Sequence, residues 1–296
     1  MTDAQGRVEP SGVWATAVGV ARVRALETAR EEPLFRDPLA LAFATAGGRG
    51  PSAPQPERGD ETSRRRWLGV ALSIIIRTRF LDDLLDSAAA AGVRQVVLLG
   101  AGMDSRAFRM DWPEGTRLFE VDPAEPLGFK ASVLRQERAV PRCERITVPV
   151  DLRDDWPAAL AAAGHDRTLP TAWIAEGLLG YLPPEAQDRL FDEITRLSAP
   201  GSRIATDWQP DMQVLSNDSV RAIVASQRAK GLDLDDPSEL TYLGERNGVV
   251  DYLDQHGWHT TTVTVEDEFV ANGLVFHPDE AMTGLYNASY TSARLP

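Results

Sequence analysis

Cysteine and long apolar runs are nearly absent from this chain of 296 residues, and both absences narrow what the protein can be. The single cysteine, Cys143, cannot form a disulfide within the chain. The first residues also lack the basic region followed by an apolar region that marks a secretory signal. No apolar stretch reaches the roughly 18–20 residues that cross a bilayer. We therefore expect a cytoplasmic protein without a membrane span.

Positive charge is scarce as well, since 31 Lys and Arg residues face 44 Asp and Glu residues, for a net charge of −13. Proteins that bind nucleic acid nonspecifically or lie on anionic membranes rely on clustered positive charge. The composition therefore argues against both partners and favours a small molecule. It leaves open whether the chain is a monomer or a homodimer.

Apolar strands alternate with helical segments from residue 93 onward. Strands are predicted at 94–100, 116–121, 145–150, 171–176 and 202–207, with helices near 104–109, 124–138, 154–163 and 184–198. This alternation predicts an α/β fold with a parallel sheet, in which the ligand lies beyond the carboxyl ends of the strands. The residues expected at those ends are Gly100, Asp122, Asp151, Glu176 and Asp207.

The segments on either side of this core are interpreted as additions to it. Helices are predicted over 14–30, 36–46 and 63–90, with Asp37 capping the second and a loop at 47–59 that is a lid or a connector. After Asp207 come a helical stretch to about 230, an acidic loop at 233–237, a helix near 246–256, and strands at 258–265 and 287–294. The expected divisions are a helical extension over 1–92, a cofactor-binding core over 93–207, a cap insertion over 208–245 and a C-terminal part of the sheet over 246–296.

A glycine turn after the first core strand is the most informative motif. Gly100 and Gly102 allow positive φ and let a ligand approach the backbone without meeting a Cβ. Asp122 ends the next apolar run about 20 residues later, the spacing at which a carboxylate reaches ribose hydroxyls. Together these features predict a nucleoside-containing cofactor.

The third position of the motif separates two cofactor classes. A turn that binds a pyrophosphate would need glycine at position 105, but Ser105 stands there and Asp104 precedes it. An anionic side chain at this place would repel a pyrophosphate, yet it suits a cationic cofactor or a helix N-cap. S-adenosylmethionine carries a sulfonium and an ammonium and has no phosphate, so it is favoured over NAD.

Several segments together carry a family resemblance. They are Ala25-Leu26-Glu27, Asp37-Pro38-Leu39-Ala40, Arg77-Thr78-Arg79-Phe80-Leu81-Asp82-Asp83, Leu99-Gly100-Ala101-Gly102-Met103-Asp104-Ser105-Arg106, Phe119-Glu120-Val121-Asp122, Val150-Asp151-Leu152-Arg153 and Ala175-Glu176-Gly177-Leu178-Leu179-Gly180-Tyr181-Leu182. The chain resembles bacterial S-adenosylmethionine-dependent methyltransferases related to leucine carboxyl methyltransferase and to polyketide O-methyltransferases of the tetracenomycin type. The resemblance implies a class I, Rossmann-like fold with seven strands, mostly parallel, helices on both faces and a reversed final strand.

The resemblance also implies a cofactor-binding set: Arg77, Gly100, Ala101, Gly102, Asp122, Asp151, Leu152 and Glu176. Arg77 would pair with the methionyl carboxylate, with Arg79 as a substitute. Asp122 would accept from the ribose hydroxyls. Two alternatives stay open: Asp151 either meets the adenine together with Leu152 or caps a helix, and Glu176 either binds the ammonium or is a buried ion-pair partner.

The implied reaction is O-methylation of a carboxylate or hydroxyl on a small molecule such as a polyketide-like metabolite. It would proceed by positioning, with no catalytic side chain assigned and no metal. Possible substrate contacts are Tyr181, Trp208 and Arg22 or Arg24, although both arginines could equally face solvent. The absence of histidine from the matched motifs favours a carboxylate acceptor. An NAD-dependent oxidoreductase and a noncatalytic cofactor-binding scaffold are the alternatives.

Overall fold

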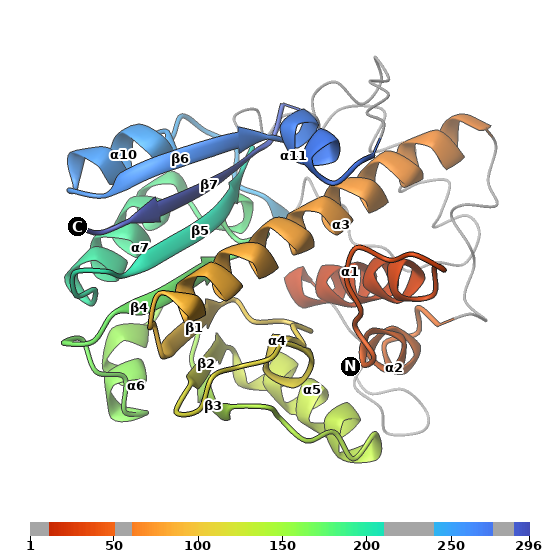
Figure 1. Cartoon of the computed structure of the whole chain (residues 1–296), viewed down its shortest axis with the longest axis horizontal. Coiled ribbons are helices and arrows are strands. Elements are labelled where there is room, and N and C mark those ends of the chain that lie inside the picture. Colours follow the sequence, from red (N-terminus) through yellow and green to blue (C-terminus); the bar gives the residue numbers. More distant parts are fainter. Residues whose placement is uncertain (1–11, 51–60, 210–239, 275–286) are drawn as a thin grey trace.

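A seven-stranded sheet organises the chain, with strand order β3-β2-β1-β4-β5-β7-β6 (Figure 1). The computed structural model describes residues 12–50, 61–209, 240–274 and 287–296. The strands are β1 (Gln95–Leu99), β2 (Arg117–Asp122), β3 (Glu144–Pro149), β4 (Thr171–Ala175), β5 (Arg203–Trp208), β6 (His259–Thr264) and β7 (Ser289–Arg294). Strands β1 to β5 pair in parallel, whereas β7 runs antiparallel to both β5 and β6. The predicted class I architecture with a reversed last strand is therefore confirmed.

Helices precede, connect and follow these strands. They are α1 (Val13–Thr28), α2 (Ala40–Ala46), α3 (Glu61–Ala90), α4 (Arg106–Arg109), α5 (Ala124–Gln136), α6 (Trp156–Ala162), the 3-10 helix η2 (Leu179–Tyr181), α7 (Pro184–Arg196), α10 (Val249–Gln255) and α11 (Val265–Ala271). The sequence did not predict η2 or α11. Thr264 begins α11 through a capping box with Asp267, a signal that a Thr-x-x-Asp spacing provides.

The helix predicted from 36 begins later than expected, at Ala40, and Asp37 is not its N-cap. Asp37 instead lies buried in an ion pair with Arg24, and it accepts a bond from the backbone N–H of Leu39. The predicted cap is therefore wrong, because the Asp37 carboxylate is bound by Arg24 from another helix. The predicted helix over 210–230, the loop at 233–237 and most of the loop at 47–59 lie outside the described residues.

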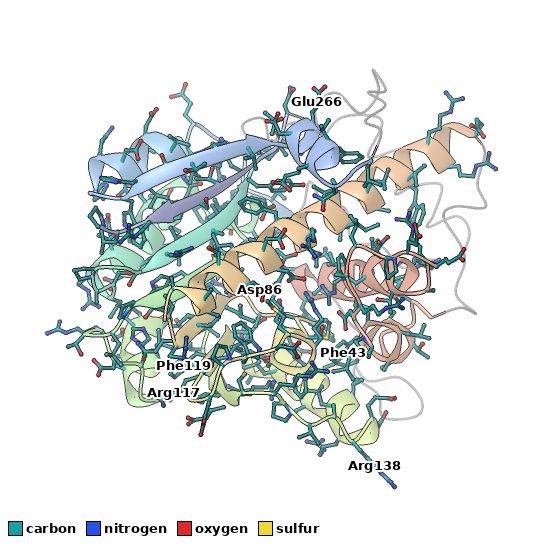
Figure 2. The ribbon with its side chains drawn as sticks, viewed as in Figure 1. Phe43, Asp86, Arg117, Phe119, Arg138 and Glu266 are labelled. Carbon is teal, nitrogen blue, oxygen red and sulfur yellow. The ribbon has the colours of Figure 1, made fainter. Side chains whose placement is uncertain are left out.

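The alternation of side chains along the strands builds two apolar layers. One face of the sheet packs against α6, α7 and α10, with Val97, Phe119 and Trp173 in its core. The other packs against α3 and α4, with Val96, Leu98, Leu118, Ala172 and Ile174. Helices thus cover both faces, as predicted (Figure 1). In Figure 2, Phe43 and Phe119 lie within the body, whereas Arg138 and Glu266 point into solvent.

The N-terminal helices lie against the glycine turn. A third core of Val18 from α1, Phe43 from α2, Met103 from the turn and Val133 from α5 joins them to the sheet. A Cβ on Gly102 would come within 2.9 Å of the Cβ of Ala17, so this glycine also permits the close packing of α1. Within the described ranges, no helix combines the length and the apolarity needed to cross a bilayer.

Candidate functional site

The glycine turn is fixed to the end of β2. Gly100 and Gly102 adopt φ of 66° and 44°, as the sequence predicts. The backbone N–H groups of Gly100 and Ala101 both donate to the carbonyl of Val121, at 2.9 and 3.1 Å. The N–H of Gly102 donates to Oδ2 of Asp122 at 2.5 Å. Residues 20 positions apart therefore meet because the two parallel strands end side by side.

Asp122 is largely buried, and its carboxylate has one oxygen committed to the turn. In the described part of the chain no hydrogen bond engages its other oxygen, Oδ1, which leaves that atom for a ligand. Burial raises the pKa of Asp122 to about 6, against the lowering effects of the Gly102 amide and the charge of Lys130. Its position fits the predicted ribose contact, which stays a prediction.

Asp151 lies on the loop after β3, next to the same strand end. The N–H of Val150 donates to the carbonyl of Asp122 at 3.0 Å, which fixes that loop. The Asp151 carboxylate accepts three bonds from Arg153, through its backbone N–H, Nε and Nη2 at 2.9, 2.9 and 2.6 Å. The alternative in which Asp151 caps the next helix is wrong, since Asp155 caps α6. Leu152 packs against the core beneath, with part of its side chain exposed.

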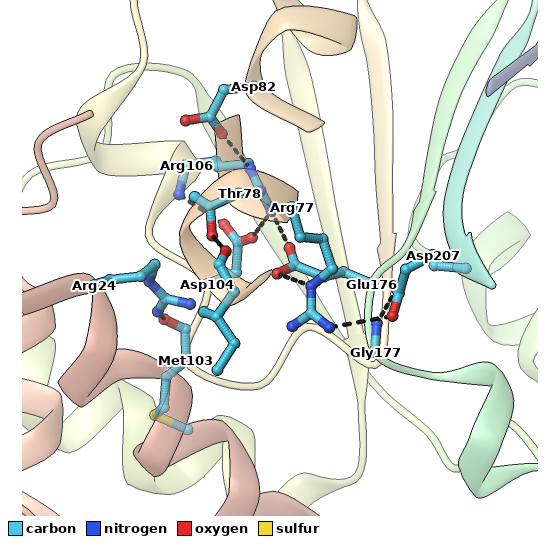
Figure 3. A network of polar contacts seen from close by, with 12 residues as sticks. Arg24, Arg77, Thr78, Asp82, Met103, Asp104, Arg106, Glu176, Gly177 and Asp207 are labelled. Atoms are coloured by element: carbon cyan, nitrogen blue, oxygen red, sulfur yellow. Dashed lines mark hydrogen bonds and ion pairs between the residues drawn. The ribbon is translucent and has the colours of Figure 1, made fainter. Parts of the chain in front are cut away.

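An arginine paired with three carboxylates lies at the base of the site (Figure 3). Arg106 is buried at the start of α4, and its Nη1 lies 2.8 Å from Oε2 of Glu176. It also pairs with Asp104, and its Nε donates to Asp82 at 2.7 Å. Arg109 contacts the same Asp82 through two bonds of 2.6 and 2.7 Å. Asp104, for which the sequence allowed a helix-cap role, accepts from the N–H of Arg106 at 2.7 Å.

Arg77 links this cluster to β5. Its Nε donates to Oε1 of Glu176 at 3.1 Å, and its Nη1 donates to Oδ2 of Asp207, also at 3.1 Å (Figure 3). Asp207 in turn accepts the N–H of Gly177 at 2.6 Å. Although burial by itself would raise the pKa of Glu176, the charges of Arg106 and Arg77 lower it to about 2. Glu176 is therefore the buried ion-pair partner that the sequence allowed, and its contact with an ammonium stays a prediction.

The ion pairs leave this network one positive charge short. Three guanidinium groups face four carboxylates, and its members are Arg77, Arg106, Arg109, Asp82, Asp104, Glu176 and Asp207. A buried anionic excess is costly unless a cation is bound nearby. S-adenosylmethionine, with a sulfonium, an ammonium and a carboxylate, carries one net positive charge. The charge of the network and the glycine turn both fit this donor.

The other predicted arginines do not line the site in the way the sequence allowed. Arg79 pairs with Asp83 on the exposed side of α3 and donates to the carbonyl of Leu34, so it is no substitute for Arg77. Arg24 is buried, and its Nη2 donates to the carbonyl of Met103 at 2.6 Å, which excludes a solvent-facing role. Arg22 is buried as well, so it too does not face solvent.

Arg77 also lines a cavity of about 190 Å³. Its walls come from five separate segments: Ser73, Arg77, Gly177, Leu178, Leu179, Gly180, Tyr181, Asp207, Trp208, Gln209, Thr241, Arg246, Ala288 and Tyr290. Tyr181 and Trp208 both line it, and their predicted contact with the substrate stays a prediction. Trp208 also packs against the core, so it has the packing role and the pocket role together. Arg22 is not among the lining residues.

Arg246 is a lining residue that the sequence did not reveal. Its guanidinium donates to the carbonyls of Leu179 and Tyr242 at 2.8 Å each, and to the carbonyl of Leu182 at 3.3 Å. It also donates to Oε1 of Gln187 at 3.2 Å. All of these acceptors are neutral, and no carboxylate of the described residues forms an ion pair with it. Arg246 therefore holds η2 in place and brings a positive charge to the cavity wall, and the nearby charge of Asp188 acts on it without forming an ion pair.

Sequence reasoning missed Arg106, Lys130 and Arg246 as site residues. Arg106 and Lys130 lie in helices where a charge is ordinarily solvated, yet both are buried. Arg246 follows a long stretch without any matched motif. Only the positions of their partners, far away in the sequence, reveal their roles.

Comparisons with known proteins agree with this geometry. The family model of leucine carboxyl methyltransferase matches residues 17–195. A Frankia alni protein whose name gives the provisional assignment S-adenosyl-L-methionine-dependent methyltransferase is 65% identical over 275 residues, covering 92% of each chain. A Streptomyces avermitilis protein with the same provisional assignment is 60% identical over 275 residues, again with 92% of each chain covered.

Solved structures share the fold at low sequence identity. A DUF574 family protein from Streptomyces avermitilis superposes with a TM-score of 0.53 at 15% identity, covering 93% of this chain and 97% of that one. A structure from Thermobifida fusca gives a TM-score of 0.52 at 16% identity, covering 93% and 94%. From the match over most of its length, the chain belongs to the leucine carboxyl methyltransferase family.

Proposed function

We propose that this S-adenosylmethionine-dependent methyltransferase transfers the methyl group to a carboxylate on a small anionic molecule. The observation that carries the proposal is the place of Arg77. Its guanidinium joins the donor-side network through Glu176 and also lines the cavity that would hold the acceptor. A donor on one side of Arg77 and an acceptor on the other would be neighbours.

The donor half would be held by groups already described. Asp122 would accept from the ribose through Oδ1, while Asp151 and Leu152 would contact the adenine. The Nη2 atom of Arg77, which has no hydrogen bond in the described part of the chain, would donate to the methionyl carboxylate. The anionic excess of the network would favour the cationic end. These same features disfavour NAD, whose pyrophosphate would meet Asp104.

The cavity wall supports an anionic acceptor. Arg246 brings a positive charge whose hydrogen-bond acceptors are all neutral, so its charge would attract a carboxylate in the cavity. Tyr181 and Trp208 add flat, partly apolar surfaces. A small aromatic or polyketide-like acid matches this lining and a volume of about 190 Å³.

In this reaction the side chains mainly bind the donor and acceptor, orient them and exclude water. The donor, when bound, supplies a methyl group already activated by its sulfonium. A carboxylate is ionised at neutral pH and needs no base, whereas a phenol with a pKa near 10 would gain from one. Among the described lining residues none is a histidine, and Asp207 is already paired with Arg77. Both facts favour a carboxylate over a hydroxyl.

The test is to incubate the protein with methyl-labelled S-adenosylmethionine and three sets of probes: benzoic acids, the matching benzamides and phenols. We expect labelled product from the acids alone, and we expect mild alkali to release the label because it cleaves methyl esters and leaves methyl ethers intact. Alkali-stable products would assign a hydroxyl acceptor. Donor binding by calorimetry without transfer to any probe would contradict O-methylation of small acids and favour a noncatalytic scaffold.

A further inference from the structure

A fully buried lysine lies beneath the residue proposed to hold the ribose. Lys130 projects from α5, and its side chain has no exposed surface. Its Nζ lies 2.9 Å from Oε2 of Glu120 on β2, which is equally buried. The angles of this contact are outside the range of a hydrogen bond, so the ammonium donates to no acceptor in the described part of the chain. A buried ammonium with uncommitted protons is rare in a folded protein and points to a further anionic partner.

Glu120 does not need this lysine for its own charge balance. Arg145 of β3 already donates to both of its oxygens, from Nε at 2.9 Å and from Nη2 at 2.6 Å. This bidentate pair is the geometry in which a guanidinium neutralises a carboxylate best. Two cations therefore face one anion, and Lys130 is the cation in excess.

The sheet places the missing anion next to that excess. Side chains two residues apart on a strand point to the same face, so Asp122 follows Glu120 on the side that α5 covers. The field of Lys130 acts on Asp122 and also on Asp104 at the glycine turn. Asp122 is thus the anion on the Lys130 side whose second oxygen is uncommitted.

We propose that Lys130 is a positioning residue for the methyl donor: its buried charge keeps the carboxylate of Asp122 ionised, and so sets the pH range in which the donor binds. The inference rests on the proposed contact between Asp122 and the ribose. Lys130 itself cannot touch the donor, because it has no exposed surface.

The pH dependence follows from the groups that face Asp122. Desolvation, Glu120 on its own strand and Asp151 on the loop after β3 raise the pKa of Asp122, whereas the Gly102 amide and Lys130 lower it, with a balance of about 6. Removal of Lys130 raises that pKa further, because an opposite charge that favours the ionised form is lost. Donor binding that needs the ionised form then weakens at neutral pH and recovers in alkali.

The experiment measures the dissociation constant of S-adenosylhomocysteine by calorimetry from pH 5 to pH 9. For the wild type we expect affinity to fall below about pH 6. For Lys130→Met we expect the midpoint to rise by at least one unit, with binding about tenfold weaker at pH 7 for a rise of about two units, and equal to the wild type at pH 9. Lys130→Arg keeps the charge and is expected to restore the wild-type midpoint.

Arg145→Gln is the matched control, since it removes the other cation of Glu120, and Arg145 is not among the main groups that shift the pKa of Asp122. A purely structural role for Lys130 predicts that both variants lose affinity by the same factor at every pH, and this result would overturn the proposal.

If Lys130→Met does not fold, Lys130→Gln replaces it in the same titration, and thermal unfolding establishes its folded fraction. A pH profile of Lys130→Gln that coincides with the wild-type profile would also overturn the proposal. If neither neutral variant folds, a wild-type affinity that stays constant down to pH 5 would overturn the proposal, and a fall below about pH 6 that is absent from Asp122→Asn would support it. Asp122→Asn separates the two proposals: unchanged affinity in that variant would contradict the ribose contact, whereas lost affinity without a shift for Lys130→Met would contradict only the role of Lys130.

Discussion

The two sides of the candidate site are built in opposite ways. The donor side gathers short motifs at the ends of β1, β2, β3 and β4, and its charges pair with one another in buried networks. The acceptor side draws on five separate segments, and its cation Arg246 donates only to neutral groups. The donor side is thus fixed by many mutually dependent ion pairs, whereas Arg246 on the acceptor side is held by neutral acceptors without an ion pair among the described residues. The difference predicts that changes on the donor side cost folding or donor binding, and changes on the acceptor side alter which molecule is methylated.

The largest expected effect follows from removing the central cation of the donor side. Arg106→Gln leaves Asp82, Asp104 and Glu176 with too few partners in a buried place, and loss of one partner of a buried ion pair costs about 3–5 kcal/mol. Urea unfolding measures the loss. Arg196→Gln, which removes an exposed pair with Glu193, is the control and should cost at most about 1 kcal/mol. Equal costs for the two variants would mean that the buried network does not stabilise the donor side.

Donor binding should distinguish the two aspartates beside the glycine turn. Asp122→Asn removes a charged acceptor from a buried position, and loss of about 1.5–3 kcal/mol corresponds to roughly 10–100-fold weaker binding of S-adenosylhomocysteine. Asp151→Asn should cost less, because Asp151 is more exposed and already bound by Arg153. Calorimetry at pH 8 compares the two. A greater loss for Asp151→Asn would place the main anchor at the adenine and not at the ribose.

A smaller and more selective effect is expected on the acceptor side. Arg246→Gln keeps some of the contacts to η2 but removes the positive charge, so the KM for an acidic acceptor should rise about tenfold, which corresponds to about 1.4 kcal/mol of lost charge attraction. The donor dissociation constant should stay within about twofold, since no donor-side group contacts Arg246. Steady-state kinetics with the acid found in the methylation screen test this. Equal weakening of donor and acceptor would show that the two sides are not separable.

The smallest effect is expected outside both sides. Arg79→Gln breaks a partly exposed pair with Asp83 and one bond to the carbonyl of Leu34, so stability should fall by about 1 kcal/mol and donor affinity should not change. Arg77→Gln, two residues away, removes the group that joins the two sides and should weaken donor binding strongly. Calorimetry of S-adenosylhomocysteine binding to the two variants, measured side by side, compares their donor affinities. Weaker donor binding for Arg79→Gln would restore the alternative in which Arg79 holds the methionyl carboxylate.

Most of the donor side was predictable because its signals are local. The turn at Gly100 and Gly102, the apolar runs and the strand-end carboxylates each require only neighbouring residues to be recognised, and the structure confirms their positions. The prediction for Asp37 was wrong because Arg24, 13 residues earlier, binds its carboxylate. Cytoplasmic location, the domain boundaries and the oligomeric state stay predictions.

The sequence by itself determined the alternation of strands and helices, because periodicity acts over a few residues, and its motifs carried the family resemblance that implied the reversed last strand. Only the tertiary structure decided which charges are paired and which are left for ligands. Arg106 meets Glu176 across 70 positions, Arg77 meets Asp207 across 130, and Tyr290 donates to the carbonyl of Ser73 across 217. Such contacts depend on how strands and helices pack. Packing buries these arginines and lysines beside distant partners, so no local sequence pattern shows that they belong to the site.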